Sequence, residues 1–393
     1  MTGLKTWVVV MCTVATSVAA QTSDKRILAS GSDFPLSPAV SAGGLVYVSG
    51  MLARDFAGDI RTQTREALER IDETLKQMDS DLAHVATVTV YLKNAADFGA
   101  MNEVYGEFFA EHAPARTTVM ANLARPTALV EIEVTAIQSG RERTIVLPDG
   151  WVAPTSPYNY GVRSGDTLFL SGLVSRNGRD NAAVDGSITT QVETIMANAT
   201  AILAAADMAL DDIVSARVYL KDAASAAEMN DAYRSNFSEA RPTRATVTTG
   251  LPGTYDVEMT FVAVKDDGVH DVVVPPAADG SPGRVGQNLS PTIRVGNRLW
   301  VSGNLGVTDA NHGDVKAQTI ETMARLGRAL TAAGFDWSDV VQAHVYVSDM
   351  QHYAGMNEAY RMTFTKDYPV RATVEAPLLN ADGLVEIALF AVK

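Results

Sequence analysis

The sequence predicts an α+β fold made of three copies of one domain, which close into a ring within a single chain. Three observations carry this prediction: landmark residues recur at a constant step, strand and helix patterns alternate within a copy, and the last strand is half apolar on its second face. A length of 393 residues with 47% hydrophobic residues fits several folded domains. The formal net charge of -14 repels phosphate backbones, so we expect no nucleic-acid partner.

The first landmark is an arginine in three variants of one hexapeptide motif: PARTTV at residues 114–119, PTRATV at 242–247 and PVRATV at 369–374. Its copies are 128 and 127 residues apart, and three further landmarks keep steps of 127 or 128 residues. The four sets are Arg116, Arg244 and Arg371; Asn102, Asn230 and Asn357; Gln63, Gln191 and Gln318; Glu131, Glu258 and Glu386. A repeat of this length is a whole domain, which excludes a solenoid of short repeats.

The first twenty residues have the pattern of a secretory signal peptide. Lys5 precedes an apolar run from Trp7 to Val14, and small residues end the segment. The run is about half of the roughly 20 residues that a membrane span needs. We therefore expect an exported protein, periplasmic or secreted, with no stable membrane anchor after cleavage; a lipoprotein linked through Cys12 is the alternative. The predicted bounds are residues 1–20 for the signal peptide and 21–140, 141–267 and 268–393 for the three domains.

The sequence pattern of the first copy predicts a series of strands and helices. Turn glycines between β-type runs predict a hairpin, apolar residues at helical spacing predict a helix, and a β-branched run predicts a strand. A second helix opens with Asp97 as its expected cap, and two strands close the unit. These elements cover residues 40–50, 64–78, 85–92 and 97–112, then a strand starting near residue 116 and another over 129–137.

Two helices cover one face of such a mixed sheet, and the other face needs a partner. In the second copy the last strand alternates Glu258, Thr260, Val262 and Val264 with an apolar side, so its second face begins polar and turns apolar. Half-apolar second faces favour packing between the sheets of neighbouring copies. Three equivalent units can then close around a threefold pseudo-axis, and the sequence predicts a single-chain pseudotrimer.

Each copy resembles a domain of the RidA family, the reactive intermediate deaminases with the chorismate-mutase-like fold. The resemblance lies in the Met-Asn-acidic-x-Tyr helix, the PxR[AT]TV strand start, the Val-Glu of the last strand and the glycine that ends the first hairpin. It covers essentially all of residues 26–393. RidA proteins are usually homotrimers with sites between subunits, so the resemblance implies the same ring in fused form. The hairpin glycines are Gly50, Gly172 and Gly303.

The resemblance also implies a function and its residues. In RidA enzymes an arginine binds the carboxylate of a small imino acid, and a glutamate positions or activates the water that releases ammonia and a 2-oxo acid. Neither a metal nor an organic cofactor is required. The candidate pairs are Arg116 with Glu131, Arg244 with Glu258, and Arg371 with Glu386; the repeated glycines and asparagines, and Tyr158, are the further substrate-binding candidates.

The chain departs from the family pattern in its pockets. The deaminases usually have a tyrosine after an early proline, and only Pro157-Tyr158 matches, against Pro38-Ala39 and Pro291-Thr292. We therefore expect Arg244, in the same copy as Tyr158, to be the first residue to test. The residue two after each arginine, often cysteine in the family, is a threonine in all three copies (Thr118, Thr246 and Thr373). The residue after each hairpin glycine differs among the copies (Met51, Leu173 and Asn304), so the three pockets differ in polarity.

Several alternatives stay open at the level of sequence. Each arginine and glutamate could form a structural salt bridge at strand ends. The same arginines could serve a non-catalytic module that binds or scavenges small carboxylates. A ribonuclease, the activity claimed for some relatives, is disfavoured by the acidic charge. The six histidines show no ligand spacing, so a zinc site is not expected.

Overall fold

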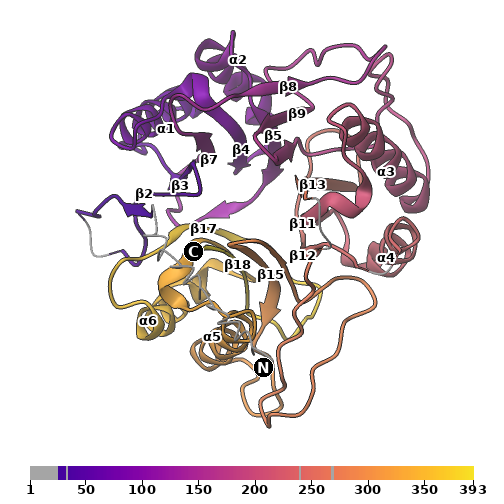
Figure 1. Ribbon diagram of the computed structural model, residues 1–393. Helices are drawn as coiled ribbons and strands as arrows, with labels where there is room; N and C mark the ends of the chain where they lie inside the picture. The colour runs from indigo at the N-terminus through magenta and orange to yellow at the C-terminus, as the bar shows by residue number, and fades with distance from the viewer. Residues whose placement is uncertain (1–24, 32–33, 239, 267–269) are drawn as a thin grey trace, which may run out of the picture.

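The computed structural model describes residues 25–31, 34–238, 240–266 and 270–393. Three six-stranded mixed sheets surround one axis, and each carries a pair of helices on its outer face (Figure 1). The predicted α+β class and the three tandem domains are confirmed. The predicted signal peptide lies outside the described residues. No helix among those described is long and apolar enough to cross a membrane.

The elements divide into three repeats, and each contains the predicted order of strand, strand, helix, strand, helix, strand, strand. Repeat 1 contains β1 (Arg26–Ile27), β2 (Ala39–Ala42), β3 (Leu45–Met51), α1 (Ile60–Lys76), β4 (Val85–Leu92), α2 (Phe98–Phe109), β5 (Ala115–Met120), β6 (Asn122–Leu123) and β7 (Val130–Ile137). Repeat 2 contains β8 (Thr144–Val146), β9 (Gly161–Ser164), β10 (Thr167–Leu170), α3 (Ile188–Ala204), β11 (Ile213–Leu220), α4 (Ala226–Arg234), β12 (Thr243–Thr248) and β13 (Val257–Val264). Repeat 3 contains β14 (Thr292–Val295), β15 (Arg298–Leu305), α5 (Val315–Ala332), β16 (Val340–Val347), α6 (Tyr353–Thr363), β17 (Val370–Glu375) and β18 (Val385–Val392). To the predicted order repeat 1 adds the short strands β1 and β6, and repeat 2 adds β8.

The sheets share one topology. In repeat 1 the strand order is β1-β2-β3-β7-β4-β5, with β4 and β5 parallel and the other pairs antiparallel. The short strand β6 leaves this sheet and pairs with β17, so repeat 1 extends the sheet of repeat 3. This exchange links the first repeat to the last and helps to close the ring.

Two details of the first copy concern helix starts. The side chain of Asp59 accepts a hydrogen bond from the backbone N–H of Thr62 and caps α1. Asp97 occupies the N-cap position of α2 as expected, but its side chain makes no capping hydrogen bond. Asp97 instead accepts a hydrogen bond from the side chain of Asn94 at 3.0 Å. A short 3-10 turn precedes α2 and already directs the chain into the helix.

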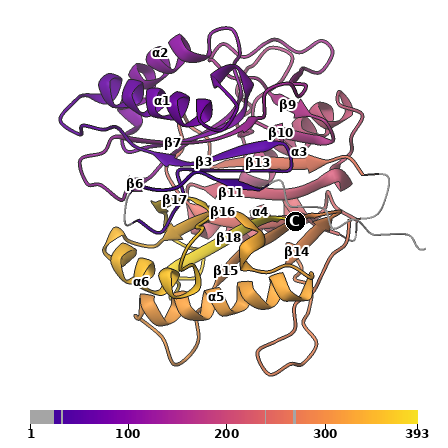
Figure 2. The same cartoon turned by 60° about the vertical axis from the view of Figure 1, so that its left-hand side comes forward.

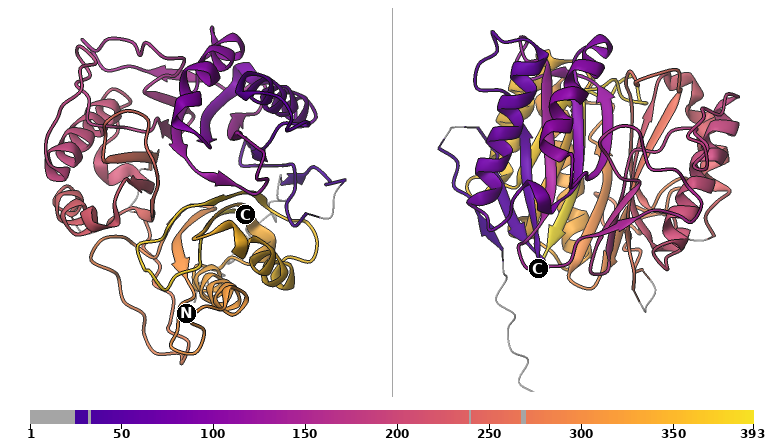
Figure 3. Two further views of the ribbon diagram at one scale, coloured as in Figure 1. Left: turned by 180° about the vertical axis from the view of Figure 1, so that it is seen from behind. Right: turned by 90° about the horizontal axis from the view of Figure 1, so that it is seen from above.

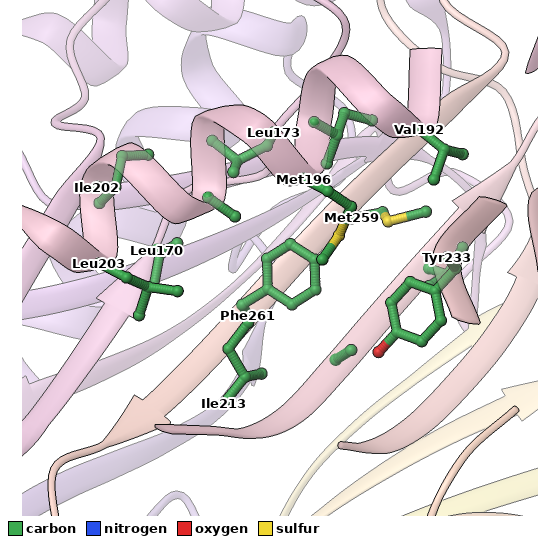
Figure 4. Packing of buried hydrophobic residues seen from close by; sticks show 14 of the residues in the cluster. Leu170, Leu173, Val192, Met196, Ile202, Leu203, Ile213, Tyr233, Met259 and Phe261 are labelled. Carbon is green, nitrogen blue, oxygen red and sulfur yellow. The ribbon is translucent and has the colours of Figure 1, made fainter. Parts of the chain in front are cut away.

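Each repeat buries the apolar stripe of its helices against the outer face of its sheet. Figure 4 shows this core in repeat 2, where side chains of α3 and of β10, β11 and β13 interlock. The residues labelled there include Val192, Met196 and Ile202 from α3 and Met259 and Phe261 from β13. Their burial holds the sheet flat against the helices and fixes which residues of each strand face outward.

The inner faces of the three sheets pack against one another, as the half-apolar last strands predict (Figures 2 and 3). One shared cluster lies toward one end of the axis and another toward the opposite end. The first contains Tyr91, Val119, Tyr219, Val247, Tyr346 and Val374, and the second contains Tyr47, Val264, Val295, Trp300, Phe390 and Val392. Because each cluster draws on all three repeats, the ring is one packed body.

Candidate functional site

The arginine and the glutamate of one repeat lie on opposite faces of their sheet. Arg116 on β5 pairs with Val88 of β4, whose side chain lies in the helix-side core. Glu131 on β7 pairs with Tyr91 of the same strand, whose side chain lies in the inner cluster. Successive side chains of a strand alternate between faces, so Arg116 and Glu131 point apart. The pairing of arginine and glutamate within a repeat, expected for all three copies, is therefore wrong.

Each arginine instead meets the glutamate of the following repeat. Glu258 of repeat 2 interacts with the Arg116 guanidinium and with the backbone N–H of Thr118, both from repeat 1. The same arrangement recurs around the ring, and we name its three instances by the repeats that they join. Junction 1–2 contains Arg116 and Glu258, junction 2–3 contains Arg244 and Glu386, and junction 3–1 contains Arg371 and Glu131.

At each junction a serine of one repeat forms a hydrogen bond with the backbone of the arginine in the neighbouring repeat. Ser171 at the end of β10 accepts a hydrogen bond from the backbone N–H of Arg116 at 2.8 Å and donates its own to the carbonyl of Asn159 at 2.6 Å. The next residue, Gly172, donates its backbone N–H to the carbonyl of Arg116 at 3.0 Å. Ser49 and Ser302 make the same contacts with Arg371 and Arg244, at 2.9 Å each. Sequence reasoning missed these serines, although each directly precedes a repeated glycine.

The repeated glycines give the glutamates room. A Cβ atom at Gly172 would lie 1.9 Å from the Oε1 atom of Glu258, closer than any side chain allows. Gly50 and Gly303 stand in the same relation to Glu131 and Glu386, again at 1.9 Å. The glutamate carboxyl group therefore lies directly over the hairpin backbone, and glycine is required at that point.

The Met-Asn-acidic-x-Tyr helix holds each arginine from the outer side. Arg116 donates to the side-chain oxygen of Asn102 at 2.7 Å, and its guanidinium lies 4.8 Å from the centre of the Tyr105 ring. The corresponding distances are 2.5 and 4.9 Å for Arg244 with Asn230 and Tyr233, and 2.7 and 4.8 Å for Arg371 with Asn357 and Tyr360. The asparagines thus orient the arginines. The tyrosines were missed, although they share the repeat step of the asparagines.

Two junctions contain guanidinium nitrogens that have no hydrogen-bond partner in the part of the chain that the structure describes. The Nε and Nη1 atoms of Arg244 and of Arg371 are buried without a hydrogen-bond partner, while Nη2 of each donates to its asparagine. No direct salt bridge to a glutamate therefore occupies these two arginines. The threonine hydroxyls two residues on are also buried and unpartnered: those of Thr118, Thr246 and Thr373. Buried donors without partners cost free energy, so such a group indicates a site for an acceptor ligand.

Burial also changes the chemistry of the glutamates. It raises the pKa of Glu258 to about 8, although the Thr118 amide and the Arg116 charge act in the opposite direction. Burial raises the pKa of Glu131 and of Glu386 to about 8 in the same way. A carboxyl group that titrates near neutral pH can both donate and accept a proton, which is what general acid–base catalysis needs.

Tyr158 lies at junction 1–2, beside Arg116. Its ring centre is 5.8 Å from that guanidinium, and both Arg116 and Glu258 act on its hydroxyl. The expectation that links Tyr158 to Arg244 is therefore wrong, since the tyrosine of repeat 2 serves the arginine of repeat 1. Among the described residues, no group of three or more His, Cys, Asp or Glu side chains could hold a metal ion.

The structure also corrects which residues of the other repeats correspond to Tyr158. The serine hydroxyl donates to the carbonyl 12 residues earlier in each repeat, from Ser171 to Asn159, from Ser49 to Ser37 and from Ser302 to Ser290. The residue before that carbonyl is Tyr158 in repeat 2, Leu36 in repeat 1 and Leu289 in repeat 3. The comparison with Ala39 and Thr292 is thus wrong in register. Only junction 1–2 has a tyrosine at this place.

Comparison with known proteins adds a family to this geometry. The family model described as Endoribonuclease L-PSP matches residues 28–138, 151–265 and 284–393. A RutC family protein of Pyrococcus horikoshii is 41% identical over 108 residues, which are 26% of this chain and 86% of that protein. A similar RutC family protein of Pyrococcus abyssi is 38% identical over 108 residues, which are 26% of this chain and 85% of that protein.

Two solved structures are similar to a share of the chain near one repeat. A member of the YjgF protein family from Neisseria meningitidis is 38% identical and covers 29% of this chain and 95% of its own, with a TM-score of 0.28. RidA from an Antarctic Psychrobacter is 28% identical and covers 31% of this chain and 99% of its own, with a TM-score of 0.30. With the family model matched three times along the sequence, the chain belongs to the RidA family and carries three tandem RidA-like domains.

Proposed function

We propose that junction 1–2 hydrolyses a small imino or enamino acid to a 2-oxo acid and ammonia. The observation that carries this proposal is the meeting of three groups from two repeats: the Arg116 guanidinium, the Tyr158 ring, and the Glu258 carboxyl group with its pKa of about 8. Arg116 binds the substrate carboxylate through parallel hydrogen bonds, which fix its orientation. Glu258 acts as the general acid toward the imine nitrogen and as the general base toward the water that attacks the carbon.

The reaction needs one group that moves protons twice. Protonated Glu258 gives its proton to the imine nitrogen, which makes the carbon electrophilic. The resulting carboxylate takes a proton from water as the water oxygen bonds to that carbon. Glu258 then gives this proton to the nitrogen, and the carbon–nitrogen bond breaks with its electron pair leaving on ammonia. The hydroxyl proton passes to the Glu258 carboxylate as the carbonyl of the 2-oxo acid forms, which restores the protonated glutamate. No electrons are gained or lost in this sequence.

Tyr158 makes junction 1–2 the favoured place for turnover. Burial raises the pKa of its hydroxyl to about 12, so it stays a hydrogen-bond donor at neutral pH. A donor beside Arg116 and Glu258 can hold the carboxylate or the leaving nitrogen in place. Leu36 and Leu289 at the other junctions offer no such donor.

A second function is favoured for junctions 2–3 and 3–1, namely binding of a small carboxylate without turnover. The buried Nε and Nη1 atoms of Arg244 and Arg371 support it, because each of them offers an unused N–H to a carboxylate oxygen. Calorimetry with 2-oxobutyrate tests this function. We expect binding that is reduced in Arg244→Ala and in Arg371→Ala; unchanged binding in both variants would contradict it.

Export and RNA cleavage are separate questions. We propose export on the first twenty residues alone, and mass spectrometry of the mature N-terminus tests it. The ribonuclease alternative is disfavoured by the net charge of -14, since an RNA site depends on cationic contacts. Salt-sensitive RNA binding by the mature chain would revive that alternative.

The deaminase proposal is tested by ammonia release from freshly generated 2-iminobutyrate. We expect Glu258→Gln to lower the catalysed rate by about 100-fold or more, the usual contribution of a general acid–base group. The matched variants Glu131→Gln and Glu386→Gln change the same residue type at the junctions without the tyrosine, so both should keep most of the rate. A wild-type rate equal to the rate without protein would refute the proposal.

A further inference from the structure

A cavity lies on the axis of the ring, around which Figure 1 shows the three sheets. It has a volume of about 820 Å³, is lined by residues of all three sheets, and reaches junction 2–3 at Arg244 and Ser302. Exposed hairpin turns at Gly43, Gly165 and Gly296 line one end. Toward the other end the axis is filled by three tyrosines that are each 1% exposed, Tyr91, Tyr219 and Tyr346. The cavity is therefore a funnel with one mouth, in the size range of small-molecule sites.

Three charged or titratable side chains meet at its floor, one from each repeat. The Oε1 atom of Glu133 is 2.9 Å from Nη1 of Arg217 and 3.2 Å from Nε2 of His344. Arg217 also donates through Nη2 to the Thr89 hydroxyl at 3.0 Å. A carboxylate oxygen only accepts, so the arrangement is satisfied when Arg217 and the Nε2–H of His344 both donate to it.

The two nitrogen-bearing groups face the cavity more than the glutamate does. The side chains of Arg217 and His344 are 16% and 18% exposed, and that of Glu133 is 6% exposed. A guanidinium has five N–H donors; Glu133 and Thr89 take two of them, and Nη1 also lies 3.2 Å from Nε2 of His344, which leaves further N–H groups for a ligand. The floor thus presents hydrogen-bond donors to the funnel, with the carboxylate behind them.

The floor is asymmetric although the ring is nearly threefold. The register of β4, β11 and β16 places Thr89, Arg217 and His344 at equivalent positions, opposite Glu133, Thr260 and Ala388. A ring of three identical chains would set three copies of the same side chain around the axis. The single chain sets one arginine, one histidine and one glutamate there, so its floor can recognise one ligand in one orientation.

The walls of the funnel are amphipathic. Trp300, Phe390 and Tyr47 form an aromatic wall, with the Phe390 ring centre 4.9 Å from Trp300 and 5.6 Å from Tyr47. Polar side chains line the inner faces elsewhere, including Ser215 and Gln342. A flat apolar body fits the aromatic wall, and an anionic end fits the donors of the floor.

We propose that the axial cavity binds one small aromatic carboxylate per chain, with its carboxylate at Arg217 and His344 and its ring against Trp300 and Phe390. This site is independent of the junction chemistry. The two also differ in number, since the axis offers one site per chain and the junctions offer three arginines.

Calorimetry of the whole mature chain with benzoate tests the proposal, with benzamide as the neutral probe. We expect one benzoate per chain at the axis, with benzamide at least tenfold weaker, and quenching of fluorescence that is lost in Trp300→Phe. The double variant Arg217→Thr with Glu133→Thr should lose this binding event, because both positions then match Thr89 and Thr260. Equal quenching of Trp300 fluorescence by the two probes, or quenching by benzoate that survives in the double variant, would overturn the proposal.

A second variant keeps the test decisive if the double variant fails to fold. Glu133→Gln removes the anion behind the donors and keeps an oxygen that Arg217 and His344 can reach. Benzoate should then bind several-fold more tightly, because the repulsion between carboxylates is gone. Unchanged or weaker binding would contradict a carboxylate at this floor. Arg116→Ala is the control for the junction site and should leave the axial event in place.

Discussion

The last strand of each repeat has two neighbouring inner-face positions, one that holds the same residue in all three repeats and one that holds a different residue in each. The first position is Glu131, Glu258 or Glu386, identical in all three repeats and placed at a junction. The second, two residues on, is Glu133, Thr260 or Ala388 and lines the axial cavity. A junction is built once per repeat and needs its own full set of groups. The axis occurs once per chain, so each repeat can contribute a different side chain to it.

The electrostatics of the two glutamate positions differ accordingly. At the junctions burial dominates and raises the pKa of each glutamate to about 8. At the axis burial acts in the same direction, but the charges of His344 and Arg217 outweigh it and hold the pKa of Glu133 near 2. The first position thus holds a proton at neutral pH, and the second holds a negative charge.

The largest expected effect is on stability, from Arg217→Ala. This variant leaves the Glu133 carboxylate buried with His344 and the Tyr91 hydroxyl but without its guanidinium partner, and breaking a buried ion pair in this way costs about 3–5 kcal/mol. Urea unfolding of the variant measures the loss. Arg298→Ala is the matched control, because its partner Asp166 is half exposed and that pair should contribute about 1 kcal/mol or less. Equal losses of unfolding free energy in the two variants would show that the buried axial pair stabilises the fold no more than an exposed pair does.

The next effect concerns activity. Arg116→Ala should lower the deaminase rate on the order of 100-fold, because the substrate loses the group that orients its carboxylate. Arg244→Ala removes an arginine with the same asparagine and tyrosine contacts, at a junction with Leu289 in place of Tyr158. We expect that variant to keep most of the rate. Initial rates of ammonia release compare the two, and the reverse order would place turnover at junction 2–3.

The pH dependence of stability separates the junctions from the axis. A glutamate whose pKa rises to about 8 on folding binds more protons in the folded state, so its contribution to stability falls as pH rises from about 4.5 through 8. The thermal midpoint should therefore be higher at pH 5.5 than at pH 9. Glu386→Gln should reduce that difference by removing one such glutamate. Glu133→Gln should reduce it less, because Glu133, with a pKa of about 2, titrates below this window and acts only through its charge, which helps to raise the pKa of Glu131. An unchanged difference in Glu386→Gln would contradict the raised pKa.

Much of the junction could be predicted from the sequence because its residues repeat. The arginines, glutamates, glycines and asparagines recur at one step, and the helix that carries each asparagine fixes the side from which it meets its arginine. Which glutamate lies beside which arginine could not be predicted from the repeats alone. It depends on which face each strand residue occupies, and a register between β4, β5 and β7 that shifts by one residue would reverse it.

Two further misses have different causes. Tyr158 was compared with the wrong residues because the proline before it is not the fixed point of the segment; counting 12 residues back from Ser171, Ser49 and Ser302 gives the right register. Arg217 and His344 were passed over because a search for repeats selects positions that stay identical. A functional group supplied once per ring leaves no such trace in the sequence.

The smallest expected effect is a difference between two threonines. The Thr89 hydroxyl at the axis accepts a hydrogen bond from Arg217, whereas the Thr246 hydroxyl at junction 2–3 is buried without a protein partner. Thr89→Val should therefore cost about 1–3 kcal/mol, and Thr246→Val should be nearly neutral, since it removes a polar atom that gained nothing. Unfolding in urea measures both. If junction hydroxyls serve a ligand, Thr246→Val should also weaken 2-oxobutyrate binding while its stability is kept. A loss of stability equal to that of Thr89→Val would instead give the hydroxyl a structural role.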